Sequence, residues 1–85
     1  MHKEGNGMQR NVHAHIHQGE DGFYVAECVQ IPVTSQGRTL DETMANLQEA
    51  VALHLEGEDL AALGLAPDPS LVVTLEVQPA AAHVA

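Results

Sequence analysis

The chain has 85 residues and a mass of 9.0 kDa, which leaves room for one domain and excludes a second folded unit. Hydrophobic residues make up 45% of it and charged residues 18%, a composition typical of a globular domain and not of a disordered segment. Lys and Arg number 3 against 12 Asp and Glu, which gives a formal net charge of −9, so direct binding of nucleic acid by this chain is not expected.

The two ends of the chain differ in composition from the segment between them. Residues 1–9 are polar and contain glycines, and residues 79–85 are a Pro-Ala tail. Such ends bury little apolar surface, so we expect both to be flexible. The sequence therefore predicts a single folded domain over residues 10–78.

In the first half of the domain, apolar and polar residues alternate in the pattern typical of β-strands. From Val12 to His17, apolar residues alternate with histidines, which predicts a half-buried strand with the histidines on its outer face. Residues 18–22 contain the Gly and Asp residues of a hairpin turn, so the chain is expected to reverse there. Residues 23–29 predict a second strand that is apolar on both faces, and such a strand lies in the centre of a sheet or is covered by another subunit. A short third strand is expected over residues 33–36.

A helix is predicted after the turn at Gly37. Thr39 and Glu42 have the spacing of a capping box, in which each side chain satisfies a free backbone N–H at the helix start. Gly57 is expected to end the helix, and residues 58–63 to add one or two further turns. Apolar residues three and four positions apart predict one buried helix face, formed by Leu40, Met44, Leu47, Val51 and Leu55.

The last expected element is a strand over residues 71–77. Apolar residues alternate there with Thr74 and Glu76, so one face is predicted to lie in the core and the other outward. The order of elements is β-β-β-α-β. A small sheet covered on one face by one helix buries the apolar side of each, so the sequence predicts a two-layer α+β fold. The residues of this strand expected in the core are Leu71, Val73, Leu75 and Val77.

Several of these segments resemble the HicB family of antitoxins over about residues 12–77. Members typically show a Gly-Tyr-containing second strand, a Thr-Gln-Gly turn, and a helix opening with a Glu-Glu-Ala-like segment. In this chain the loop before the third strand is shortened to Gln30-Ile31-Pro32, and Thr43 stands where Ala is usual. The segments that carry the resemblance are Gly22 to Cys28, Ile31-Pro32, Thr34 to Glu42 and Asn46 to Ala50.

The resemblance implies a fold and a function. The fold is a partial ribonuclease H-like β-β-β-α-β arrangement, and the function is to bind and block HicA, a small basic toxin that cleaves mRNA. Many members also carry a C-terminal segment that binds operator DNA. We expect this chain to have no DNA-binding segment of its own, since the sequence shows none after the last strand.

The acidic composition itself suits a basic protein partner, because complementary fields raise the rate of encounter. The alternative interpretation is that the charge serves solubility alone. For a basic toxin, the expected contacts are an aromatic anchor with carboxylates around it. The candidate partner-binding residues are Glu20, Asp21, Tyr24 and Glu27.

The three alternating histidines raise a second hypothesis, a small homo-oligomeric metal-binding protein. His13, His15 and His17 share one strand face, but the Cα atoms of the outer two are ~13 Å apart, too far for all three to reach one ion easily. A further ligand would have to come from His54, Glu27 or another subunit. The simpler interpretation is a polar surface that faces solvent or a subunit, so no metal or other cofactor is expected.

Catalysis is not expected. Ribonuclease H-like chemistry needs several carboxylates around two metal ions, and the first strand offers histidines and no acid. A nucleophilic Cys28 would require a lowered pKa, and a small buried hydrophobic role is the simpler interpretation.

Size and composition also predict where the protein is located and whether it forms oligomers. A polar opening, no run of about 18 apolar residues and a single cysteine suggest a cytoplasmic protein without a membrane span. Phe23 and Tyr24 are the only aromatic residues, and one cysteine cannot form an internal disulfide. A domain with so little core gains stability from a partner chain, so we expect a dimer or larger homo-oligomer.

Overall fold

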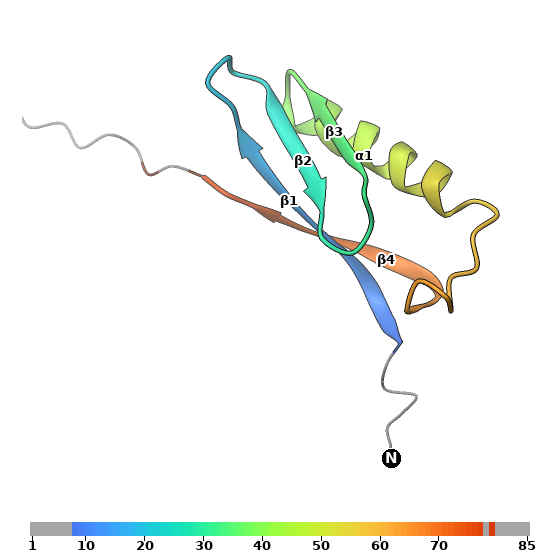
Figure 1. The fold of residues 1–85 in the computed structure, drawn as a ribbon. Helices are drawn as coiled ribbons and strands as arrows, with labels where there is room; N and C mark the ends of the chain where they lie inside the picture. The colour runs from blue at the N-terminus through green and yellow to red at the C-terminus, as the bar shows by residue number, and fades with distance from the viewer. Residues whose placement is uncertain (1–7, 78, 80–85) are drawn as a thin grey trace, which may run out of the picture.

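The computed structural model describes residues 8–77 and residue 79. A four-stranded sheet and one helix occupy this part of the chain and form two layers (Figure 1). The predicted α+β fold with β-β-β-α-β order is confirmed. The tails expected at residues 1–9 and 79–85 lie almost wholly outside the described residues, although Gln9 already belongs to the first strand. The elements are β1 (Gln9–Gln18), β2 (Tyr24–Cys28), β3 (Thr34–Gly37), α1 (Leu40–Leu55) and β4 (Leu65–Leu75).

The sheet has the order β3-β2-β1-β4, so β1 and β2 are the inner strands and β3 and β4 the edges. β1 runs antiparallel to β2 and parallel to β4, and β2 runs antiparallel to β3. α1 packs on β3 and β2 and has few contacts with the other two strands (Figure 1). Among the described residues, α1 therefore covers the β3 and β2 side of one face of the sheet, and the opposite face has no helix on it.

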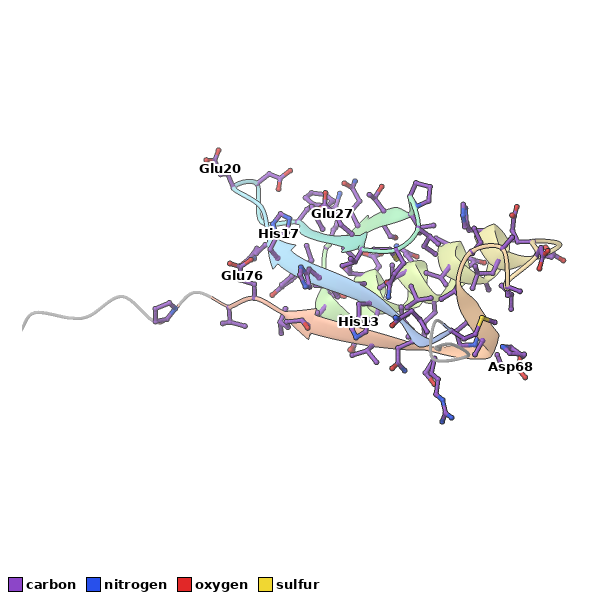
Figure 2. All side chains as sticks on the ribbon, turned by 60° about the horizontal axis from the view of Figure 1, so that its bottom comes forward. His13, His17, Glu20, Glu27, Asp68 and Glu76 are labelled. Atoms are coloured by element: carbon purple, nitrogen blue, oxygen red, sulfur yellow. The ribbon has the colours of Figure 1, made fainter. Side chains whose placement is uncertain are left out.

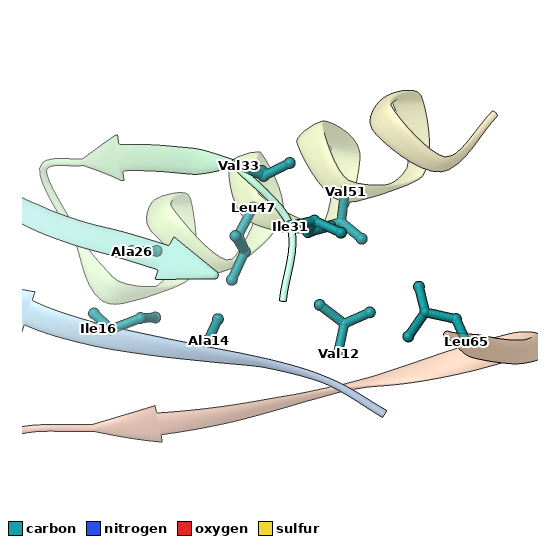
Figure 3. Packing of buried hydrophobic residues seen from close by; sticks show 9 residues of the cluster. All are labelled: Val12, Ala14, Ile16, Ala26, Ile31, Val33, Leu47, Val51 and Leu65. Carbon is teal, nitrogen blue, oxygen red and sulfur yellow. The ribbon is translucent and has the colours of Figure 1, made fainter. Parts of the chain in front are cut away.

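The core lies between α1 and the inner strands (Figure 3). The predicted alternation of β1 is confirmed, since the side chains of Val12, Ala14 and Ile16 are 0–1% exposed and point toward the helix layer. The loop between β2 and β3 also supplies core residues, since Ile31 and Val33 are 3% and 7% exposed. The full buried set is Val12, Ala14, Ile16, Ala26, Ile31, Val33, Leu47, Val51 and Leu65.

The start of α1 follows the predicted capping pattern in part. The Oγ1 atom of Thr39 accepts a hydrogen bond from the Glu42 N–H at 3.0 Å, as expected. The return bond differs, because the Glu42 carboxylate accepts from the N–H of Arg38 (2.6 Å) instead of Thr39. Thr43 is fully buried, and its hydroxyl donates to the Thr39 carbonyl at 2.8 Å. Gly37, at the end of β3, lies directly against Thr43, which ties the sheet to the first helical turn.

The last strand departs from the prediction in length and in burial. β4 begins at Leu65, earlier than expected, and its pairing with β1 is irregular around Asp68, which has a φ of 53°. The expectation that its apolar row lies in the core is wrong for Leu75 and Val77, which are 41% and 69% exposed. The reason is the strand order, since β4 lies at the edge beyond β1 and α1 does not extend over it.

Candidate interaction surface

The side of the sheet that α1 does not cover forms the first candidate surface, here called the open face (Figure 2). As predicted, His13, His15 and His17 share this side of β1, opposite the core. Strand pairing sets the neighbours of these histidines on β2 and β4, since directly paired residues point to the same face. The open face consists of His13, His15, His17, Val25, Glu27, Thr34, Gln36, Val72 and Thr74.

Carboxylates border the histidine row. His15 is the direct cross-strand partner of Glu27 on β2. Beyond the end of β4, the N–H of Glu76 donates to the carbonyl of Ile16 at 2.8 Å, which places Glu76 beside the other end of the row, near His17 (Figure 2). The open face therefore combines a row of imidazole side chains with carboxylates at its border.

Gln30 fixes one end of this row, a role that the sequence did not predict. Its Oε1 accepts the His13 N–H at 2.7 Å, and its Nε2 donates to the carbonyl of Asn11 at 3.1 Å. The same Nε2 lies 3.2 Å from the His13 Nδ1. Because an amide nitrogen only donates, the Nδ1 of neutral His13 accepts and its proton is on Nε2. The amide of Gln30 thus replaces strand pairing where β2 has ended.

The surroundings of the histidine row bear on the metal-binding hypothesis. Among the residues that the structure describes, no group of three or more His, Cys, Asp or Glu side chains is placed to hold a metal ion. His54, one of the three sources considered for a further ligand, lies on α1, and the sheet separates it from the row on β1. Glu27 is paired with His15 across the strands. Among the described residues, no third metal-ligating side chain lies close enough to complete a site with these two.

The four residues predicted to bind a partner do not lie in one patch. Glu20 and Asp21 are exposed at the tip of the β1–β2 hairpin, where the Oδ1 of Asp21 accepts the Phe23 N–H at 3.0 Å and shapes the turn. Glu27 is exposed on the open face. Tyr24 points to the opposite side and packs, half-buried, against the core. The structure thus joins the hairpin tip with the open face and separates Tyr24 from them.

Comparison with known proteins gives one informative match. A UPF0150 protein of Synechocystis sp. is 44% identical to the chain over 46 residues, which are 53% of this chain and 67% of that protein. The chain belongs to the UPF0150 family. No protein-family model matches it, and no solved structure does.

Two further features of this UPF0150 chain bear on its chemistry. Burial raises the pKa of the Cys28 thiol above its usual value, so the thiol stays protonated near neutral pH and is a poor nucleophile. None of the described segments forms a helix with the length and apolar composition needed to cross a membrane.

This UPF0150 chain also has an apolar groove, of about 690 Å³, between α1 and β4. Val51 and Leu55 of α1 form one wall, Leu60 closes one end, and Leu71 of β4 lies opposite. The sequence did not indicate the groove, because alternation along β4 has the same appearance whether a helix covers the strand or not. The groove and the edge of β4 beside it form a second candidate surface, which is mainly apolar, whereas the open face is mainly polar.

Proposed function

We propose that this chain is an antitoxin-like protein that binds a small basic, HicA-like, mRNA-cleaving toxin and blocks its access to RNA. The observation that carries the proposal is the match to a UPF0150 protein, because the UPF0150 family is related to the HicB-like antitoxins. The β-β-β-α-β fold is compatible with it. The chain itself would catalyse no reaction and would act as a competitor of the RNA.

The charge of the chain supports a basic partner. At a formal net charge of −9, the chain attracts a basic protein over a distance set by salt screening, and this attraction raises the association rate. An acidic surface also occupies the same basic side chains that RNA phosphates would contact. Such binding would exclude RNA because the chain neutralises the basic side chains of the toxin and also occupies the space that RNA would need.

The hairpin tip and the adjoining open face are the surface that best fits such a toxin. Glu20 and Asp21 project from the tip, and Glu27 lies on the face that continues from it. A partner seated there leaves α1 and Tyr24 free, because both lie on the opposite side of the sheet. The toxin contact is thus expected to depend on Glu20 and Glu27 and not on Tyr24.

RNA cleavage by the cognate toxin, with and without the chain, tests the proposal. An equimolar amount of the chain should stop cleavage. Undiminished cleavage in a molar excess of folded chain would show that the proposal is wrong, and a submicromolar zinc site found in the same sample would favour the metal-binding hypothesis instead.

A charge-matched pair of variants locates the contact. The double variant Glu20→Lys/Glu27→Lys changes the tip and the open face. The variant Glu49→Lys/Glu56→Lys makes the same change in net charge at two other exposed positions, one on α1 and one at its C-cap. Both weaken the overall field equally, so any difference between them reports local contact. We expect the first variant to slow toxin association several-fold more than the second. Equal association rates for the two variants would show that the toxin does not contact the tip or the open face.

A further inference from the structure

The outer edge of β4 has backbone groups that no strand among the described residues pairs with. The N–H of Glu76 donates to Ile16 of β1, and neighbouring residues of a strand point their backbone groups in opposite directions. From Ser70 onward, where the pairing with β1 is regular, the backbone groups of the even-numbered residues of β4 therefore face β1 and those of the odd-numbered residues face outward. Leu71, Val73 and Leu75 thus present free N–H and C=O groups along this edge.

One half of the same edge is blocked. Pro67 and Pro69 precede the regularly paired segment, and neither has the N–H that a pairing strand would need. Edge strands of soluble proteins commonly carry proline for this reason. In β4 the protection ends at Pro69, so the segment from Leu71 onward is open to pairing.

Side chains around the open segment are apolar and incompletely covered. Leu71 and Val73 are half-buried beside the groove, while Val72, Leu75 and Val77 are 39%, 41% and 69% exposed. The segment from Ser70 to Leu75 contains no charged residue, although the chain as a whole has a net charge of −9. Two acidic copies of the chain can therefore approach each other here with little local repulsion.

We propose that β4 pairs antiparallel with β4 of a second copy, around a two-fold axis at Val73, to form a continuous eight-stranded sheet. The inference does not depend on the toxin proposal. In this register Val73 lies opposite its own copy and Leu71 opposite Leu75, so all three outward-facing residues are paired and about six backbone hydrogen bonds form. Glu76 then lies opposite Ser70, and no two carboxylates face each other.

Neighbouring registers fit less well. An axis at Val72 places Leu75 opposite Pro69 in both halves of the contact, so each of these two pairs has one hydrogen bond instead of two. An axis at Thr74 pairs Leu71 with Val77, which lies beyond the end of β4. The contact is of the small class, below about 1,200 Å² in total, so we expect a dimer that dissociates on dilution. Its strength should rise with salt, because salt screens the repulsion between two chains of net charge −9.

The test begins with the mass of the particle in solution, measured by sedimentation over a range of concentrations. The chain should pass from 9.0 kDa to twice that mass as concentration rises. Val73→Lys puts two lysines opposite each other on the axis and should weaken dimerisation at least tenfold, while Val73→Thr keeps a β-branched, uncharged side chain and should leave it nearly unchanged. Circular dichroism of each variant shows whether the monomer still folds.

Cross-linking tests the register without relying on a destabilised variant. In a Cys28→Ser background, Val73→Cys places two thiols across the axis with Cα atoms about 5.5 Å apart, within disulfide range. Val77→Cys is the control, because its copy would be about 26 Å away. We expect mild oxidation to link the first variant and not the second. A monomer at all concentrations, or a dimer that Val73→Lys leaves intact and Val73→Cys does not link, would overturn the proposal.

Discussion

The substitution Gly37→Ala tests the closest approach between the two layers. A Cβ atom at Gly37 would lie 2.7 Å from both the backbone N and the Oγ1 of Thr43, and 3.1 Å from the carbonyl carbon of Glu42. Thr43 is held in place by its hydrogen bond to Thr39, and the side-chain amide of Asn46 donates to the carbonyl of Gln36 at 2.9 Å. β3 and α1 must therefore separate by several tenths of an ångström, against a network that holds them together.

The expected cost is near the upper end of the range for overpacking, about 2–3 kcal/mol of unfolding free energy, because one of the clashing atoms belongs to the backbone. In urea this corresponds to a midpoint lower by roughly 2–3 M, for a dependence of about 1 kcal/mol per M in a domain of this size. Thr43→Ala in the same chain should restore only part of the loss, since it removes Oγ1 and leaves the backbone N. Protein concentration must be kept constant if the chain dimerises.

Gly57→Ala is the matched control. Gly57 has a φ of 76° with open space around it, so the added methyl strains the backbone alone and costs about 1–2 kcal/mol. Gly57→Asn should recover much of that loss, because Asn adopts this conformation more readily. If Gly37→Ala costs less than Gly57→Ala, or if Thr43→Ala restores it completely, the argument from backbone contact is wrong.

Three other outcomes follow from the structure. Because burial raises its pKa, the thiol of Cys28 should react with iodoacetamide at pH 7.5 several-fold more slowly than in the urea-unfolded chain, and equal rates would contradict its burial. Calorimetric titration with zinc should show weak binding or none, whereas a submicromolar site abolished by His15→Ala would revive the metal-binding hypothesis. Raising salt from 50 to 500 mM should slow toxin association and strengthen the dimer. Faster toxin association at high salt would contradict the toxin proposal, and a weaker dimer at high salt would contradict the dimer proposal.

Features set by neighbouring residues were predictable from the sequence. The alternation from Val12 to Ile16 identified the buried side of β1, and Thr39 and Gly57 marked the ends of α1. Each of these signals depends on residues a few positions apart. The sequence therefore identified the order of elements and most of the core.

Features set by distant contacts were not predictable in the same way. The order of strands in the sheet decides whether α1 covers β4, and the alternation from Leu71 to Val77 is the same in either case. Gln30 gave no signal, because its two partner residues on β1, His13 and Asn11, are 17 and 19 residues away. The grouping of Tyr24 with Glu27 failed for a different reason, since residues an odd number of positions apart on a strand point to opposite faces.

The parallel pairing of β1 with β4 has a consequence for folding. These strands are the first and the last within residues 8–77, so their contact has the longest sequence separation between paired strands of that segment and closes its largest loop (Figure 1). The β1–β2–β3 meander and α1 contain the more local contacts and can assemble before β4 is in place. Substitutions in β4 should accordingly change the unfolding rate more than the folding rate, and β1 remains an unprotected sheet edge until β4 has been synthesised.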